Sequence, residues 1–159
     1  MLFRSRCRWL QEKYLTKLPP RADELRAAYA AMLETMDHQI GRLLDALDQL
    51  GLANGTLVVF TSDNGGHPNY TANGPLRGSK WNLYEGGIRV PMIARWPSVI
   101  QAGSACAAPV TGCDLFPTFR DVALAPADDI PRDGRSLLPM LRVDPAPAKP
   151  RPLVWHFPY

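Results

Sequence analysis

The 159-residue sequence predicts an α/β fold, and three observations carry this prediction. Residues 23–50 have the periodicity of an amphipathic helix. A β-branched apolar run at 56–61 follows after a short turn, and that run stops at Asp-Asn-Gly-Gly. A helix, a tight turn and an apolar strand in this order are typical of half of a β/α/β layer.

The long helix is indicated by apolar residues that recur at steps of three and four. Asp23 is the expected N-cap, and Gly51 is the expected glycine at the C-terminal end. Residues 1–18 show no clean period, so no element is predicted there. The residues of the apolar face are Leu25, Tyr29, Met32, Met36, Ile40, Leu43, Leu47 and Leu50.

The run Thr56–Thr61 predicts a strand covered on both faces, as strands in a parallel sheet usually are. Asp63 and Asn64 follow it, at the position where ligands bind in open α/β sheets. Their side-chain oxygens suit a hard cation such as Ca²⁺ or Mg²⁺. The same residues, with Gly65 and Gly66, are also good turn chemistry after any strand, so both interpretations stand at this point.

Residues 67–89 form a long connection whose apolar and aromatic content argues against disorder. Trp81 and Tyr84 are expected to pack this loop down. Because the loop starts where a strand ends and holds His, Arg and Lys side chains, it is a candidate wall of an anion-binding site.

Further elements are expected along the rest of the chain. They are a strand at 90–96 with Pro91 at its entry, a short strand at 107–110, a helix at 114–124 with Pro117 in its first turn, one helical turn at 136–141, and a strand beginning at 153–157.

Composition excludes several classes of function. The formal net charge is only +3, and no basic stripe alternates with aromatic residues, so nucleic acid is not an expected partner. No apolar run approaches the roughly 18 residues of a membrane span. The first ten residues do not have the pattern of a signal peptide. Three cysteines at unrelated spacings indicate neither a disulfide framework nor a zinc site.

Taken together, residues 28–159 resemble the sulfatase family of the alkaline-phosphatase-like superfamily. Each motif is weak alone, and their order and spacing carry the resemblance. The motifs are Ser62-Asp63-Asn64-Gly65-Gly66, Pro75-Leu76-Arg77-Gly78-Ser79-Lys80, Tyr84-Glu85-Gly86-Gly87-Ile88-Arg89-Val90-Pro91, Met36-Asp37 with Gly41, Asp114-Leu115-Phe116-Pro117-Thr118, Asp133-Gly134-Arg135-Ser136-Leu137 and Trp155-His156-Phe157-Pro158.

The resemblance implies a partial alkaline-phosphatase-like mixed sheet flanked by helices, forming an incomplete domain. The expected organisation is an N-terminal segment at 1–22, the later part of a catalytic domain at 23–143, and a linker with the start of a C-terminal subdomain at 144–159.

The resemblance also implies a hydrolase of sulfate esters that uses one Ca²⁺. Asp63 and Asn64 match metal ligands of the family, and Lys80 matches the catalytic lysine that contacts a sulfate oxygen. His67 and Arg77 are further candidates to bind the substrate, an aryl sulfate, a steroid sulfate or a sulfated glycan. Glu85 and Arg89 are expected to pair with each other or with loop backbone.

The family's nucleophile is a formylglycine made from Cys or Ser in a Cys/Ser-x-Pro-x-Arg motif. Neither Cys7, Cys106, Cys113 nor any serine opens such a motif, and the family's N-terminal pair of metal-binding aspartates is also absent. We therefore expect a fragment that does not hydrolyse sulfate esters alone.

Two alternatives stay open at this point. One is a fragment of a related phosphoryl hydrolase of the same superfamily. The other is a noncatalytic remnant that binds an anion or a partner. Many relatives are periplasmic or extracellular, but the sequence carries no export signal that would assign a compartment.

Overall fold

A computed structural model describes residues 8–17, 24–126, 129–142 and 150–157. The chain divides into two compact units, which are described separately. The first contains the described residues up to Ala53 together with Asn64–Arg89, and the second contains Asn54–Asp63 with the described residues from Val90 onward. Within the described residues, no helix has the length and apolar character needed to cross a bilayer.

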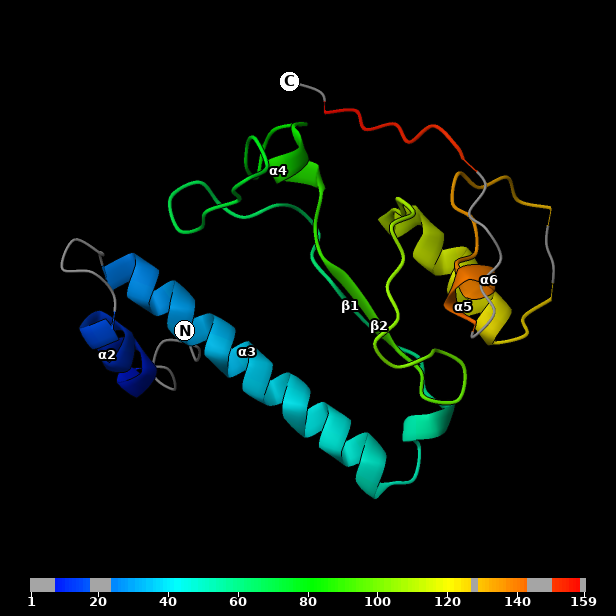
Figure 1. Ribbon diagram of the computed structural model, residues 1–159, viewed down its shortest axis with the longest axis horizontal. Coiled ribbons are helices and arrows are strands. Elements are labelled where there is room, and N and C mark those ends of the chain that lie inside the picture. The colour runs from blue at the N-terminus through cyan, green and yellow to red at the C-terminus, as the bar shows by residue number, and fades with distance from the viewer. Residues whose placement is uncertain (1–7, 18–23, 127–128, 143–149, 158–159) are drawn as a thin grey trace. The chain divides into compact units, whose positions relative to one another are not determined.

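Two helices, α2 (Arg8–Lys17) and α3 (Glu24–Gln49), pack against each other in the first unit (Figure 1). Leu10 and Ala31 are buried at their contact, with Tyr14 packed against them. Helix α2 was not predicted, because its buried stripe consists of only two residues at i and i+4. Such a stripe is too short to give a periodic signal.

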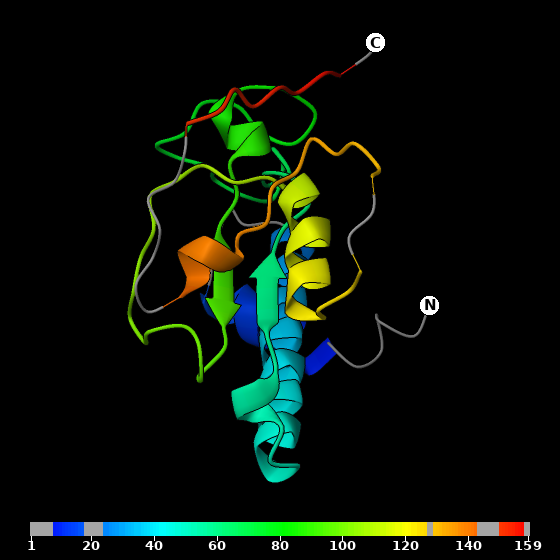
Figure 2. The same cartoon turned by 90° about the vertical axis from the view of Figure 1, so that its right-hand side faces the viewer.

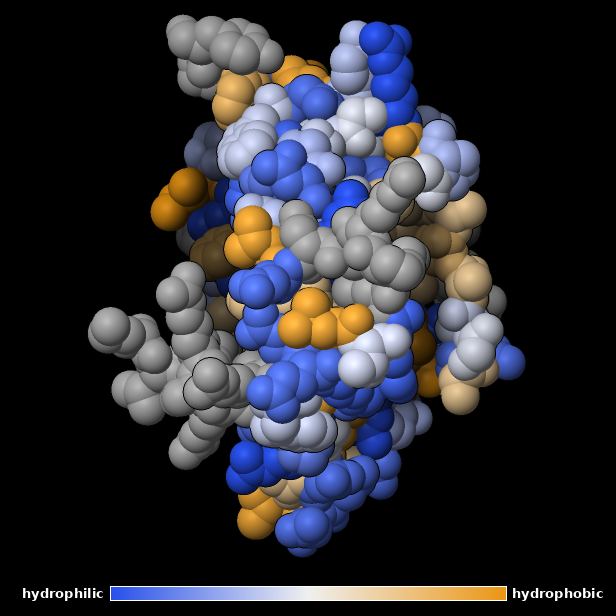
Figure 3. All heavy atoms as spheres, turned by 90° about the vertical axis from the view of Figure 1, so that its left-hand side faces the viewer, coloured by the Kyte–Doolittle hydropathy of each residue, from blue (hydrophilic) through white to orange (hydrophobic). Residues whose placement is uncertain are grey.

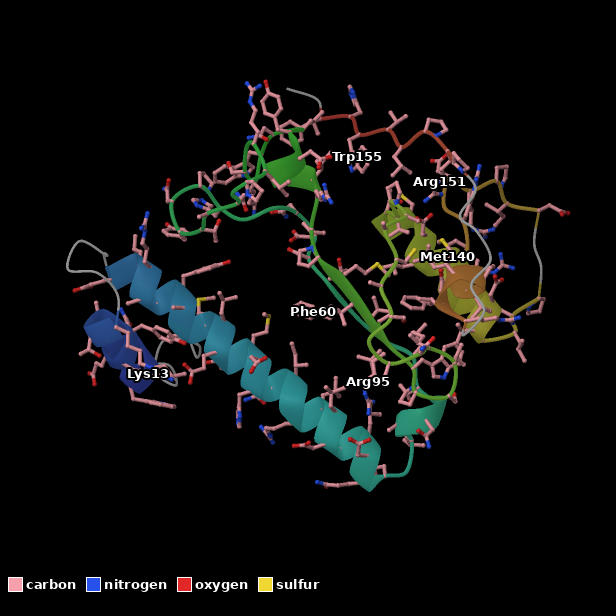
Figure 4. All side chains as sticks on the ribbon, in the orientation of Figure 1. Lys13, Phe60, Arg95, Met140, Arg151 and Trp155 are labelled. Carbon is pink, nitrogen blue, oxygen red and sulfur yellow. The ribbon has the colours of Figure 1, made fainter. Side chains whose placement is uncertain are left out.

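A carboxylate on α3 holds α2 by three hydrogen bonds. The Lys13 ammonium donates to both Glu34 oxygens, at 2.6 and 2.7 Å, and the Tyr14 hydroxyl donates to Oε2 at 2.8 Å (Figure 4). These bonds lower the pKa of Glu34, with the Lys13 bond contributing most. The same bonds from Glu34 raise the pKa of Lys13 and of Tyr14.

The predicted long helix is confirmed as α3, and Gly51 ends it as expected. Gly51 has φ +68°, its N–H donates to the carbonyl of Asp48 at 3.1 Å, and the N–H of Leu52 donates to that of Leu47 at 2.9 Å. This pair of bonds is the Schellman motif, which suits glycine because the conformation is left-handed. The expected N-cap, Asp23, lies outside the described residues.

Several apolar residues of α3 remain exposed. Figure 3 shows hydrophobic side chains scattered among hydrophilic ones on the face turned to the viewer. The exposed large hydrophobic residues of this helix are Leu25, Met32, Leu33, Met36 and Leu43.

The second unit contains a two-stranded ribbon of β1 (Val58–Thr61) and β2 (Met92–Arg95) (Figure 2). The strands are antiparallel, with Val58 opposite Arg95 and Thr61 opposite Met92. The α/β class and the second strand are confirmed. The expectation of a parallel strand covered on both faces was wrong for β1, since its described neighbour is antiparallel and Phe60 is exposed. A short apolar run fits either kind of pairing, so it cannot determine strand direction.

Three short helices follow β2. They are η2 (Gly112–Asp114), α5 (Leu115–Val122) and α6 (Leu138–Leu141), and a further turn, η1 (Ala53–Gly55), precedes β1. Helices α5 and α6 lie on the same side of the ribbon (Figures 1 and 2). Both were predicted. The strands expected at 107–110 and 153–157 were wrong, because these described residues form no ladder.

A buried carboxylate organises this second unit. Asp114 is fully buried and accepts hydrogen bonds from the backbone N–H groups of Thr111 and Arg135, each at 2.8 Å. The guanidinium of Arg151 completes the set with an ion pair (Figure 4). Burial opposes ionisation, but the bonds from Arg151, Arg135 and Thr111 outweigh it, so the pKa of Asp114 lies below its ordinary value.

Thr118 extends this cluster one helical turn further. Its buried hydroxyl donates to the Asp114 carbonyl at 2.6 Å and accepts the N–H of Leu137 at 2.8 Å. The motifs at 114–118 and 133–137, far apart in the sequence, are therefore joined by hydrogen bonds.

Candidate functional site

The loop at Asn64–Arg89 is joined backbone to backbone where it begins and ends. The N–H of Gly65 donates to the carbonyl of Gly87 at 2.8 Å. A Cβ on Gly65 would overlap the carbonyl of Gly86, and a Cβ on Gly87 would overlap that of Asn82. Gly65 and Gly87, one from each Gly-Gly pair of the sequence, are thus explained by close approach of main chains.

One amide side chain holds the middle of the loop. Asn73 Oδ1 accepts the N–H of Gly66 at 3.0 Å, and its Nδ2 donates to the carbonyls of Gly66 and Gly78 at 3.1 and 3.2 Å. Sequence reasoning assigned no role to Asn73. The only available signal was its place in Asn-Gly-Pro, which indicates a turn but not the carbonyls that its amide binds.

The Glu-Gly-Gly motif forms the single-turn helix α4 (Glu85–Ile88). The N–H of Gly86 donates to the carbonyl of Arg77 at 2.7 Å, which ties this turn to the segment before Lys80. Glu85 and Arg89 form an exposed ion pair at 2.9 Å, which confirms their predicted pairing.

Lys80 lies on the part of the loop that returns to the start of the segment. Its N–H donates to the carbonyl of Gly66 at 3.0 Å. Lys80 comes 16 positions after Asn64 in the sequence, yet this bond joins it to a residue only two positions after Asn64. The side chain is half-buried, and Nζ lies 5.8 Å from the centroid of the Trp81 ring.

His67 is held on several sides. Its ring stacks on Tyr70 at 4.5 Å between centroids and forms a T-shaped contact with Trp81 at 4.8 Å between centroids. Nδ1 accepts the N–H of Asn69 at 3.1 Å, which leaves Nε2 as the nitrogen that carries hydrogen in the neutral ring. His67 and Lys80 therefore both lie beside Trp81.

Arg77 is exposed and stacks on an aromatic ring. Its guanidinium carbon lies 3.9 Å from the centroid of Tyr84. This stacking, with the bond from Gly86 to its carbonyl, gives Arg77 a part in holding the loop.

The two expected metal ligands lie on different units of the chain. Asp63 is exposed in the second unit, and Asn64 is half-buried in the first. A carboxylate and an amide oxygen suit Ca²⁺ in kind, but Ca²⁺ takes six to eight oxygens. No group of three or more His, Cys, Asp or Glu residues gathers in the described ranges. Two side-chain oxygens would fill only a small part of such a shell, so a calcium role for Asp63 and Asn64 stays a prediction.

Comparison with known proteins identifies the family. Residues 6–125 match the family model described as Sulfatase. The chain is 45% identical over 131 residues to mouse steryl-sulfatase, covering 76% of this chain and 21% of the relative. It is 38% identical over 164 residues to a sulfatase of Formosa agariphila, covering 94% of this chain and 29% of that protein.

Solved structures agree with these matches. The crystal structure of Ps i-CgsB in complex with k-i-k-neocarrahexaose aligns with a TM-score of 0.71 at 34% identity, over 80% of this chain and 29% of that one. A protein solved with its substrate D-glucosamine-2-N,6-O-disulfate aligns with a TM-score of 0.65 at 34% identity, over 79% and 24% of the two chains. The chain thus spans about a fifth to a third of its relatives' length, and within that span it belongs to the sulfatase family.

Proposed function

We propose that this chain supplies part of the sulfate site of a sulfuric ester hydrolase. Lys80 donates a hydrogen bond to a sulfate oxygen, and Asp63 and Asn64 give two oxygens to a Ca²⁺ shell. The observation that carries the proposal is the bond from the Lys80 N–H to the Gly66 carbonyl, which returns the lysine to the start of the loop.

The proposed chemistry follows from charge. Breaking a sulfate ester gathers negative charge on oxygen, and an ammonium on a fixed backbone stabilises that charge without reorganisation. A bound Ca²⁺ supplies Lewis acidity to the same oxygens. The Gly65–Gly87 and Asn73 bonds support this role because they fix the backbone that carries Lys80.

The substrate is a sulfate ester. Relatives are named steryl-sulfatases and N-acetylgalactosamine-6-sulfatase, and the titles of solved neighbours name k-i-k-neocarrahexaose and D-glucosamine-2-N,6-O-disulfate. Steroid and glycan esters are both candidates on this ground. The formylglycine nucleophile of the family has no counterpart in this sequence, so the chain's part is binding and charge stabilisation.

Titration calorimetry tests the proposal with inorganic sulfate and Ca²⁺. Lys80→Ala should weaken sulfate binding by roughly tenfold while leaving Ca²⁺ binding intact, since a hydrogen bond to a charged group is worth about 1.5–3 kcal/mol. Asp63→Asn should weaken Ca²⁺ binding. The matched control is Lys17→Ala, which removes an exposed lysine of α2. Equal sulfate affinity in the Lys80 and Lys17 variants would contradict the proposal.

A further inference from the structure

The expectation that Trp81 packs the loop down is met only by its contact with His67. Its side chain is 58% exposed, and its backbone has φ +78°, a left-handed conformation that bulky residues rarely adopt. Strained backbone of this kind gathers at functional sites, where the surrounding structure enforces it. An exposed indole on such a backbone therefore needs an explanation other than burial of apolar surface.

The neighbouring main chain enforces the conformation. The N–H of Lys80 is bonded to Gly66, and the N–H of Asn82 donates to the carbonyl of Ser79 at 3.2 Å. Gly87 lies directly beneath this turn, since a Cβ on Gly87 would overlap the carbonyls of Asn82 and Ser79. The main chain of the turn at 79–82 is thus fixed from both sides, and this determines where the Trp81 side chain leaves the backbone.

Two polar side chains lie beside the ring. The ring of His67 meets Trp81 edge to face, with 75° between the planes, and the Lys80 ammonium lies 5.8 Å from the Trp81 centroid. His67 is itself fixed by stacking on Tyr70 and by the bond that Nδ1 accepts. The site therefore offers a rigid aromatic surface with a cation beside it.

We propose that Trp81 is a substrate-binding residue that stacks on the sugar ring bearing the sulfate, so that the substrate class is a sulfated glycan. This inference rests on the proposed role of Lys80. A pyranose ring has one face of C–H groups, which are attracted to an aromatic face, and a rim of hydroxyls that stays in water. A sulfate on that ring would then lie toward the Lys80 ammonium.

A steroid sulfate fits the same surface less well. A steroid nucleus is apolar all round, and such ligands are held in concave sites lined mainly by apolar side chains. A histidine and a lysine lie beside the Trp81 ring, and more than half of the residue's own surface is open. A single aromatic surface with polar neighbours suits a ligand that has one apolar face.

Calorimetry with three probes tests the inference: inorganic sulfate, glucose 6-sulfate and a steroid 3-sulfate, each with Ca²⁺ present. The parent chain should bind glucose 6-sulfate about tenfold more tightly than inorganic sulfate, the difference that one stacking contact of about 1.4 kcal/mol would give. Trp81→Ala should abolish this difference and leave the affinity for inorganic sulfate unchanged. Trp81→Phe should keep part of it, because a ring remains.

The matched control is Trp9→Ala, which removes another exposed tryptophan, on α2. It should bind all three probes like the parent chain. Unchanged binding of glucose 6-sulfate in Trp81→Ala, or a steroid sulfate that binds more tightly than the sugar sulfate, would overturn the glycan assignment while Lys80 still held sulfate. If the parent chain did not bind inorganic sulfate, the proposed function itself would be overturned, and the inference with it.

Discussion

The space beside Gly65 admits the hydrogen atom of glycine but not the methyl group of alanine. A Cβ there would overlap the Gly86 carbonyl, whereas Gly41 in the middle of α3 has nothing within 4 Å of an added Cβ. The same substitution should therefore have opposite effects at the two sites. Gly65→Ala should destabilise the first unit by about 1–3 kcal/mol, as overpacking does.

Gly41→Ala is the matched control and should stabilise α3 by up to about 1 kcal/mol, because alanine is the better helix former. Urea unfolding followed by circular dichroism measures both variants. A Gly65→Ala protein as stable as the parent would show that the loop can open at the Gly65–Gly87 bond.

The buried pair of Asp114 and Arg151 gives a second prediction for single residues. Arg151→Met should destabilise the second unit by about 3 kcal/mol, because a carboxylate would be left buried without its cation. Arg142→Met, which removes an exposed arginine just after α6, is the control. Equal unfolding midpoints in urea for the two variants would contradict a stabilising role for the pair.

The pKa of Asp114 sets the sign of the pH dependence. The folded state lowers this pKa below the ordinary value of 3.8, so its contribution to stability is fully present above 3.8 and is lost as the pH falls through the lower folded value. Arg151→Met removes one of the groups that lower the pKa. Acid unfolding, followed by tryptophan fluorescence, should then begin at a higher pH in that variant.

At the scale of elements, length and periodicity decided what could be predicted. Helix α3 was predictable because apolar residues repeat along it at steps of three and four, and β2 because a short apolar run follows Pro91. The direction of β1 could not be predicted, because one short apolar run does not determine which strand it pairs with or in which direction. Residues 153–157 are apolar enough for a strand, but no ladder forms there, and Arg151 attaches this segment through a side chain instead.

The same reasoning applies to the site. The Gly-Gly pairs predicted sharp turns, but the close contacts of Gly65 with the Gly86 carbonyl and of Gly87 with the Asn82 carbonyl were not predicted. The bonds of Asn73 could not be predicted, because a turn residue's amide has several backbone groups within reach. The roles of Asp63, Asn64, Lys80, His67 and Arg77 stay predictions.

The attachment of α2 to α3 should depend on pH at both ends of the scale. Glu34 has a pKa below 4.5 in the folded state, so its contribution is present above pH 4.5 and is lost as the pH falls through the folded value. Lys13 and Tyr14 have raised pKa values, so their contributions are present below about pH 10 and are lost as the pH rises through the folded values.

Hydrogen exchange of α2 amides measures this attachment. Glu34→Gln should speed exchange near neutral pH and flatten its acid dependence, while Asp37→Asn, an exposed change on α3, should do neither. Protection of α2 that is identical in parent and Glu34→Gln would show that Leu10 and Ala31 hold the helix without the carboxylate.

At the scale of the whole molecule, the chain corresponds to 21% of the length of mouse steryl-sulfatase and 29% of that of the Formosa agariphila sulfatase. It includes the proposed lysine and two proposed metal ligands, and it has no Cys/Ser-x-Pro-x-Arg motif. We predict that residues 1–159 alone do not hydrolyse an aryl sulfate in the presence of Ca²⁺. Release of the phenol above the level of a Lys80→Ala preparation would contradict this.

The main-chain bonds of the loop have a consequence for how such proteins diversify. Lys80 is anchored through peptide groups at Gly66 and beneath the turn by Gly87, and neither anchor depends on the identity of an outward-facing side chain. Exposed residues such as Trp81 and Leu83 can therefore be exchanged without shifting the backbone that carries Lys80. In this way, substitutions at outward-facing positions can change which sulfate ester is bound while the backbone of the loop stays the same.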